Sequence, residues 1–180
     1  MPARLAQFAR RQDGAAAVEF ALVALPFLAL LFAILETALV FFASQSLEAT
    51  AADVGRLVMT GQAQTGVSPT TGAAGYSAQD FKNAACARLS GLFDCNQLYV
   101  SVQSYNNFSG YSYADPVQSG KMTVDVNNLP FSDGSPGSIV VVQLYYQWPI
   151  LVSLLNSHLA DINGNRLLVA TAVFRNEPYQ

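Results

Sequence analysis

The residues best placed to do chemistry lie near the start of the 180-residue chain, where Glu19 stands at the entrance to a long apolar segment. Residues 20–35 of this segment carry no charge. A carboxylate buried beside such a segment is costly unless a cation neutralises it. Glu19 is therefore a candidate for a charge-paired contact. The alternative is a side chain that reaches back to the lipid headgroups, because Glu19 lies only about one helical turn inside the segment.

The element that must position Glu19 is an apolar helix of membrane-spanning length. Counted past Glu36 to residue 43, it holds about 24 mostly apolar residues, or roughly 36 Å of helix. Arg4, Arg10 and Arg11 precede it, and the positive-inside bias then keeps the N-terminus in the cytoplasm and exports the rest. Glu36 is expected at the outer face of the bilayer. A cleaved secretory signal fits less well, because its apolar core is usually about 7 to 15 residues long.

The order of residues around Glu19 is specific. A basic leader ends at Gly14, the small residue Ala15 follows, Glu19 is the fifth residue after the glycine, and the aromatic Phe20 comes next. This order resembles the processing site of type IV pilin-like proteins.

The resemblance is closest to the TadE-like pseudopilins of the tight-adherence (Flp-type) pilus machinery. It rests on residues 12–21, on the apolar stretch with Pro26 that follows, and on the C-terminal run 170–179. The middle of the chain carries no comparable signature.

The resemblance implies that a membrane-embedded prepilin peptidase, an aspartyl protease, cuts after Gly14 and removes residues 1–14. A glycine has no side chain to obstruct a narrow protease cleft. Cleavage leaves a new ammonium on Ala15, which can neutralise Glu19 of a neighbouring subunit inside a bundle of helices. We therefore expect a processing site at Gly14 and Ala15 and a subunit-docking site at Glu19 and Phe20.

The function implied by the resemblance is that of a minor pilin or pseudopilin in assembly of the tight-adherence pilus. The chain is expected to cross the bacterial inner membrane once, with its C-terminal domain in the periplasm; whether it enters the pilus is left open. Its expected partners are that membrane, the prepilin peptidase, other pilins or pseudopilins and the pilus assembly complex. Two alternatives remain: an uncleaved single-pass assembly factor, and a surface-displayed adhesive module, to which only the tyrosine-rich stretch 104–115 points.

Cys86 and Cys95 are the only two cysteines. In an oxidising compartment they predict one disulfide, which closes a loop of about 10 residues and contributes about 2 to 3 kcal/mol of stability. A pair of buried thiols is the alternative. Two cysteines and the distant His158 do not supply four metal ligands, so no metal site is expected.

The sequence gives little sign of an enzyme. His158 is the only histidine, and we find no nucleophile elbow, phosphate loop or paired-carboxylate motif. We expect no catalytic residue, no cofactor and no small-molecule substrate. The isoelectric point of about 4.9 makes nucleic acid an unfavourable partner. Residues 161–165 alternate oxygen-bearing side chains but lack the glycine of a calcium loop, and they predict a tight Asn-Gly turn instead.

Helical periodicity continues beyond the apolar segment. Leu47, Ala51, Val54 and Val58 form one apolar stripe that the rest of the chain must cover, and Gly61 is a plausible stop. The predicted organisation is a cytoplasmic basic leader (1–14), a transmembrane helix (15–43), its amphipathic continuation (44–61), a linker (62–77) and a periplasmic head (78–180).

The head is predicted to be an α+β domain. A short helix is expected over 78–92 with Ser77 as its cap, followed by strands at 98–105, 121–126, 138–148 and 166–174. These would form an antiparallel sheet of about four strands with one face available to pack on helix.

Overall fold

The computed structural model describes residues 13–89, 91–112, 115–126, 128–152, 160–162 and 164–178. The chain divides into two compact units, residues 1–38 and 39–180, and each is described by itself. Helix α2 (Asp13–Met59) contributes to both units. His158 and most of the expected leader lie outside the described residues.

In the first unit, α2 exposes apolar side chains rather than burying them. Its most apolar stretch has a mean hydropathy of 2.6 and none of it is buried, and the helix is long and apolar enough to cross a membrane. Pro26 lies inside the helix, where it removes one backbone hydrogen bond. Membrane helices tolerate such a proline when neighbouring groups satisfy the freed carbonyl.

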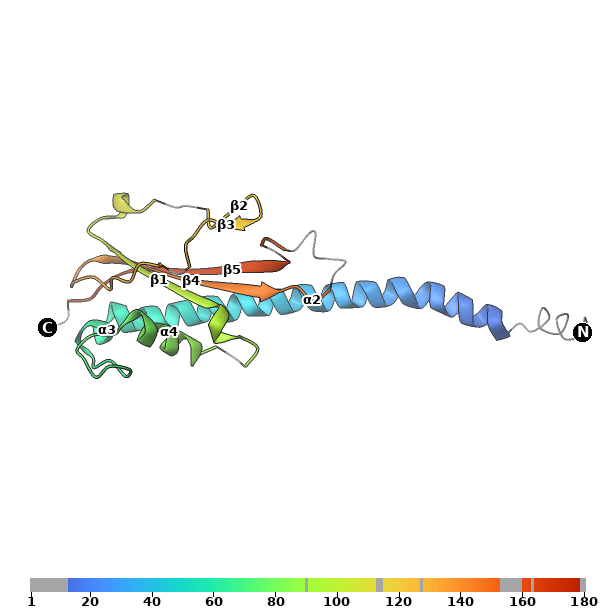
Figure 1. Ribbon diagram of the computed structural model, residues 1–180, viewed down its shortest axis with the longest axis horizontal. Coiled ribbons are helices and arrows are strands. Elements are labelled where there is room, and N and C mark those ends of the chain that lie inside the picture. Colours follow the sequence, from blue (N-terminus) through green and yellow to red (C-terminus); the bar gives the residue numbers. More distant parts are fainter. Residues whose placement is uncertain are drawn as a thin grey trace, which may run out of the picture. The chain divides into compact units, whose positions relative to one another are not determined.

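The second unit is built on a three-stranded antiparallel sheet of order β1-β4-β5 (Figure 1). Its strands are β1 (Leu98–Tyr105), β4 (Ile139–Pro149) and β5 (Asn165–Arg175). All three agree with the predicted strands to within one residue at each end. Ile162 and Asn165 exchange backbone hydrogen bonds and Gly164 has φ +83°, so a tight turn opens β5 as expected.

The remaining predicted strand, at 121–126, does not join this sheet. Instead β2 (Val117–Gln118) and β3 (Lys121–Met122) form a separate two-stranded sheet. Ser119 and Gly120 between them have φ values of 53° and 72°, the left-handed conformation that two-residue hairpin loops require. The prediction of about four strands in one sheet is therefore corrected to three strands and a small hairpin.

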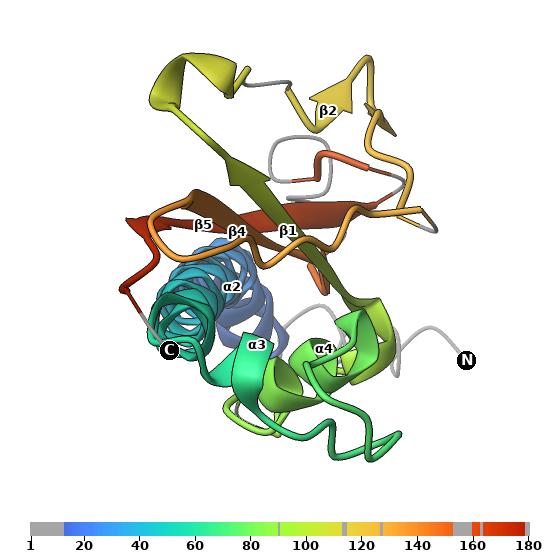
Figure 2. The ribbon, with the colours of Figure 1, turned by 90° about the vertical axis from the view of Figure 1, so that its left-hand side faces the viewer.

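The core of the second unit lies between the sheet and the C-terminal part of α2. Every member of the predicted stripe on α2 is buried, and the stripe joins side chains from β1, β4 and β5 in one cluster. Figure 2 shows α2 against one face of the sheet with α4 beside it, and β2 on the opposite face. On that second face Tyr145 and Leu167 form a smaller cluster with residues around β2 and β3.

Helix α2 ends where the sequence predicted, because Gly61 adopts the left-handed conformation with φ 79°. The expected linker contains a short helix, α3 (Gln62–Thr65). Helix α4 (Ala78–Cys86) starts at the predicted cap Ser77 but stops six residues before the expected end at 92. Two short 3-10 turns, η1 (Cys95–Gln97) and η2 (Phe108–Gly110), flank β1.

Candidate functional site

Gly14 and Ala15 lie in the first turn of α2 and are exposed. A Cβ atom added to Gly14 would meet nothing within 4 Å, and its φ is not positive. In a helix, glycine is about 1 kcal/mol less favourable than alanine. No side-chain packing among the described residues therefore requires a glycine at position 14.

Glu19 is exposed on α2, one turn after Ala15. Residues four apart lie on the same face of a helix and are separated by about 6 Å along its axis. Residues 13–38 include no Lys, Arg or His, so no side-chain cation of this described stretch faces Glu19. A cation for Glu19 must be a new amino terminus or a group from elsewhere.

The surroundings of Glu19 are apolar and open. Phe20 is 75% exposed, and apolar side chains between Ala17 and Pro26 form an open face of the helix. Small residues such as Ala17 and Ala21 let another helix approach closely in a membrane. The four residues predicted for processing and docking are thus gathered within the first two turns of α2.

The comparison with protein families identifies this same stretch. Residues 14–56 match the family model of TadE-like proteins. The match starts at Gly14 and ends at Arg56, near the C-terminus of α2, so it confirms the resemblance for this segment, which we call the TadE-like segment. No curated protein and no solved structure matches the chain.

Within the TadE-like segment, the Glu36 side chain is only 3% exposed. Its expected place at the outer face of the bilayer stays a prediction.

Beyond the TadE-like segment, the most strongly bound carboxylate is Asp80, which sequence reasoning missed. Its oxygens accept hydrogen bonds from the Ser68 hydroxyl at 2.7 Å, the Thr70 amide at 3.0 Å, and the amide and hydroxyl of Ser77 at 2.8 and 2.6 Å. Burial raises the pKa of the Asp80 carboxyl, but these hydrogen bonds outweigh burial and hold the pKa well below its usual value. Asp80 therefore clamps the preceding loop onto α4.

The predicted disulfide joins Cys86 to Cys95, with Cα atoms 5.8 Å apart. It links the end of α4 to η1 just before β1. No group of three potential metal ligands occurs among the residues that the structure describes.

Proposed function

We propose that the chain is a minor pilin or pseudopilin that takes part in assembly of a tight-adherence (Flp) pilus. The observation that carries this proposal is the placement of Gly14, Ala15 and Glu19 at the start of an exposed apolar helix, where the match to TadE-like proteins begins. In this proposal the helix anchors the chain in the bacterial inner membrane, with its N-terminus in the cytoplasm and its head in the periplasm.

The first step is maturation by a prepilin peptidase. Hydrolysis adds one water across the Gly14–Ala15 bond and leaves a carboxylate on Gly14 of the leader and an ammonium on Ala15 of the mature chain. The exposure of Gly14 and Ala15 and the open space around Gly14 in the described part of the chain support this step.

The second step is docking through Glu19 and Phe20. An ammonium and a carboxylate 4 Å apart attract each other by about 4 kcal/mol at an effective dielectric constant of 20. The lack of cationic side chains in residues 13–38 leaves Glu19 to pair with an Ala15 ammonium, and an exposed Phe20 and the neighbouring apolar face of the helix offer contact to a second helix. Pairing between subunits then fixes the register of the two helices.

The processing step predicts the mass of the mature protein. The chain purified from membranes of a host with an active prepilin peptidase should begin at Ala15, and Gly14→Leu should retain the leader because the larger side chain obstructs the protease cleft. Intact-mass spectrometry measures both. Gly91→Leu is the matched control, because Gly91 also has open space around it and no positive φ.

A native chain that still carries the residues before Ala15 in such a host would contradict the processing step. It would favour the alternative of an uncleaved single-pass assembly factor.

A further inference from the structure

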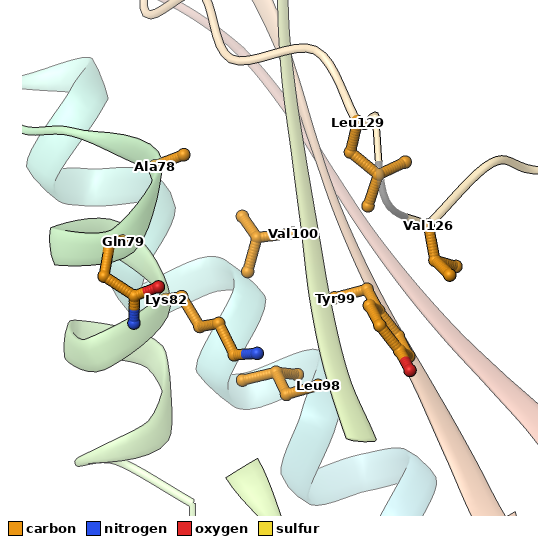
Figure 3. Close-up of a pocket in the computed structure, with 8 residues that line it drawn as sticks. All are labelled: Ala78, Gln79, Lys82, Leu98, Tyr99, Val100, Val126 and Leu129. Atoms are coloured by element: carbon orange, nitrogen blue, oxygen red, sulfur yellow. The ribbon is translucent and has the colours of Figure 1, made fainter. Parts of the chain in front are cut away.

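A cavity of about 150 Å³ lies on the face of the three-stranded sheet that is turned away from α2. Side chains of a strand alternate between the two faces of its sheet. Figure 3 shows this alternation in β1, where Leu98 and Val100 extend toward the side of α4 and Tyr99 extends to the opposite side. Ser101 and Gln103 follow Tyr99 at intervals of two residues, so they lie on its face of the sheet and line the cavity.

The lining of the cavity is polar on one side, apolar on another and uncharged throughout. Ser101 and Gln103 of β1 and Gln143 of β4 supply hydroxyl and amide groups. Val124 and Leu129, from the segment between β3 and β4, supply apolar side chains. None of the residues that line the cavity is charged. An ion would lose its hydration there without meeting a counter-ion, so the cavity suits a neutral ligand.

Gln143 provides a buried hydrogen-bond donor inside this lining. It lies opposite Ser101 of β1 and Thr171 of β5, and its side chain is 8% exposed. Its Oε1 atom accepts a hydrogen bond from the Tyr145 hydroxyl at 3.1 Å, whereas none of the described residues accepts one from its Nε2 atom. A buried donor without an acceptor is unfavourable. A ligand with an oxygen atom at this position would supply the acceptor.

Two tyrosines restrict the shape of the ligand. Tyr105 and Tyr111 line the cavity, and both belong to the tyrosine-rich stretch 104–115. Their ring centroids are 5.9 Å apart and their planes meet at 87°, so they do not form the parallel pair of faces that would sandwich a flat aromatic ligand. A sugar ring needs no such pair, because it carries C–H groups on its faces and hydroxyls, which both donate and accept, around its rim.

The size of the cavity limits the ligand further. At about 30 Å³ for each water molecule, it has room for roughly five waters. Sites for drug-sized ligands are larger, at about 300 to 1,000 Å³. One small ring therefore fits, and a folded peptide segment does not.

We propose that this cavity binds one neutral sugar ring as a ligand rather than as a substrate. Gln143 donates its free amide N–H to a hydroxyl of the sugar, and Leu129 and the tyrosine rings contact the C–H groups. The ring is either a free monosaccharide or the terminal residue of a glycan. This site is separate from the processing and docking residues on α2, so the two proposals can fail independently.

The experiment is saturation-transfer difference NMR on the full chain in lipid nanodiscs, with empty nanodiscs as the background. The probes are glucose, galactose, mannose and N-acetylglucosamine, and the comparisons are glucuronate and adenine. At least one neutral sugar should receive saturation. Glucuronate and adenine should receive at least about tenfold less, because the cavity offers no cation and no parallel pair of rings. Transfer to the methyl glycoside of the best sugar indicates a terminal glycan residue, and loss of transfer to it indicates a free monosaccharide.

Three variants test the location of the site. Ser112 is exposed and lines the cavity, so Ser112→Trp should fill the cavity and abolish binding. Gln118 is exposed in β2 and does not line the cavity, so Gln118→Trp should bind like the native chain. Gln143→Met keeps the length of the side chain without its amide and should weaken binding about fivefold or more, the loss typical of one hydrogen bond in a buried site.

Three outcomes would each overturn the proposal. The first is the absence of transfer to any neutral sugar. The second is transfer to glucuronate or adenine that equals transfer to the best sugar. The third is undiminished binding to a folded Ser112→Trp or Gln143→Met variant.

Discussion

The Asp80 carboxylate connects two segments of the second unit by hydrogen bonds. It is buried, with 2% of its surface exposed, and it joins the cap of α4 to a loop that begins twelve residues earlier at Ser68. With Ser77 it forms a capping box in which each side chain accepts the other's backbone N–H. The residue thus stabilises a helix end and a loop at once.

This arrangement predicts acid-sensitive stability. Because the pKa of Asp80 is lowered in the folded state, its contribution is complete above the unfolded-state pKa of about 3.9 and is lost as pH falls through the lower folded-state pKa. Asp80→Asn should therefore be less stable than the native chain at pH 7, with a difference that shrinks below pH 4. Denaturant unfolding followed by the fluorescence of Trp148, the only tryptophan, measures this. Asp53→Asn, an exposed carboxylate on α2, should show neither effect.

At the scale of elements, α2 and β5 approach each other closely at Gly55. A Cβ atom added there would lie 2.9 Å from the Cε1 atom of Phe174. Gly55→Leu should therefore overpack this contact and lower the free energy of unfolding by about 1 to 3 kcal/mol. Ala52→Leu, on the exposed face of the same helix, should change it little. If both variants unfold at the same denaturant concentration, the predicted overpacking between position 55 and Phe174 is wrong.

The elements also show what a sequence reveals about this fold. The buried stripe on α2, the Ser77 cap and strands β1, β4 and β5 could be predicted, because each produces a local pattern of period or capping. The small hairpin could be predicted only in part: β3 forms the first two residues of the strand expected at 121–126, whereas β2, with two residues, is too short to show alternation. The partners of Asp80 were missed for a different reason. Ser68 and Thr70 lie in a Gly/Ser/Thr-rich stretch whose composition suggests a linker, and hydrogen bonds between distant residues leave no periodic signal.

The residues around the candidate site could also be predicted from the sequence only in part. Gly14, Ala15, Glu19 and Phe20 could be proposed from the sequence, because they are close together and their order resembles that of TadE-like proteins. The pairing of Val102 with Pro130 and Ser132, 28 and 30 residues away, could not be predicted, because only the folded chain reveals it.

At the scale of the whole molecule, the proposed docking predicts an effect on assembly alone. Glu19→Ala should leave cleavage and membrane insertion intact, because neither needs the carboxylate. It should impair pilus assembly, since removing one partner of a buried ion pair typically costs about 3 to 5 kcal/mol. Sheared pili collected from cells and quantified by immunoblot measure this.

Glu48→Ala, an exposed residue on the same helix, should leave the pilus yield unchanged. Normal piliation by Glu19→Ala would rule out a docking role for Glu19.

The open space around Gly14 has a consequence for timing. Because the side-chain position of Gly14 touches nothing, removing Gly14 takes no side-chain contact away from the described fold. On the proposed pathway, a subunit stays in the membrane until hydrolysis creates the ammonium on Ala15. Only then can it pair with Glu19 of another subunit. Cleavage thus acts like the activation of a zymogen.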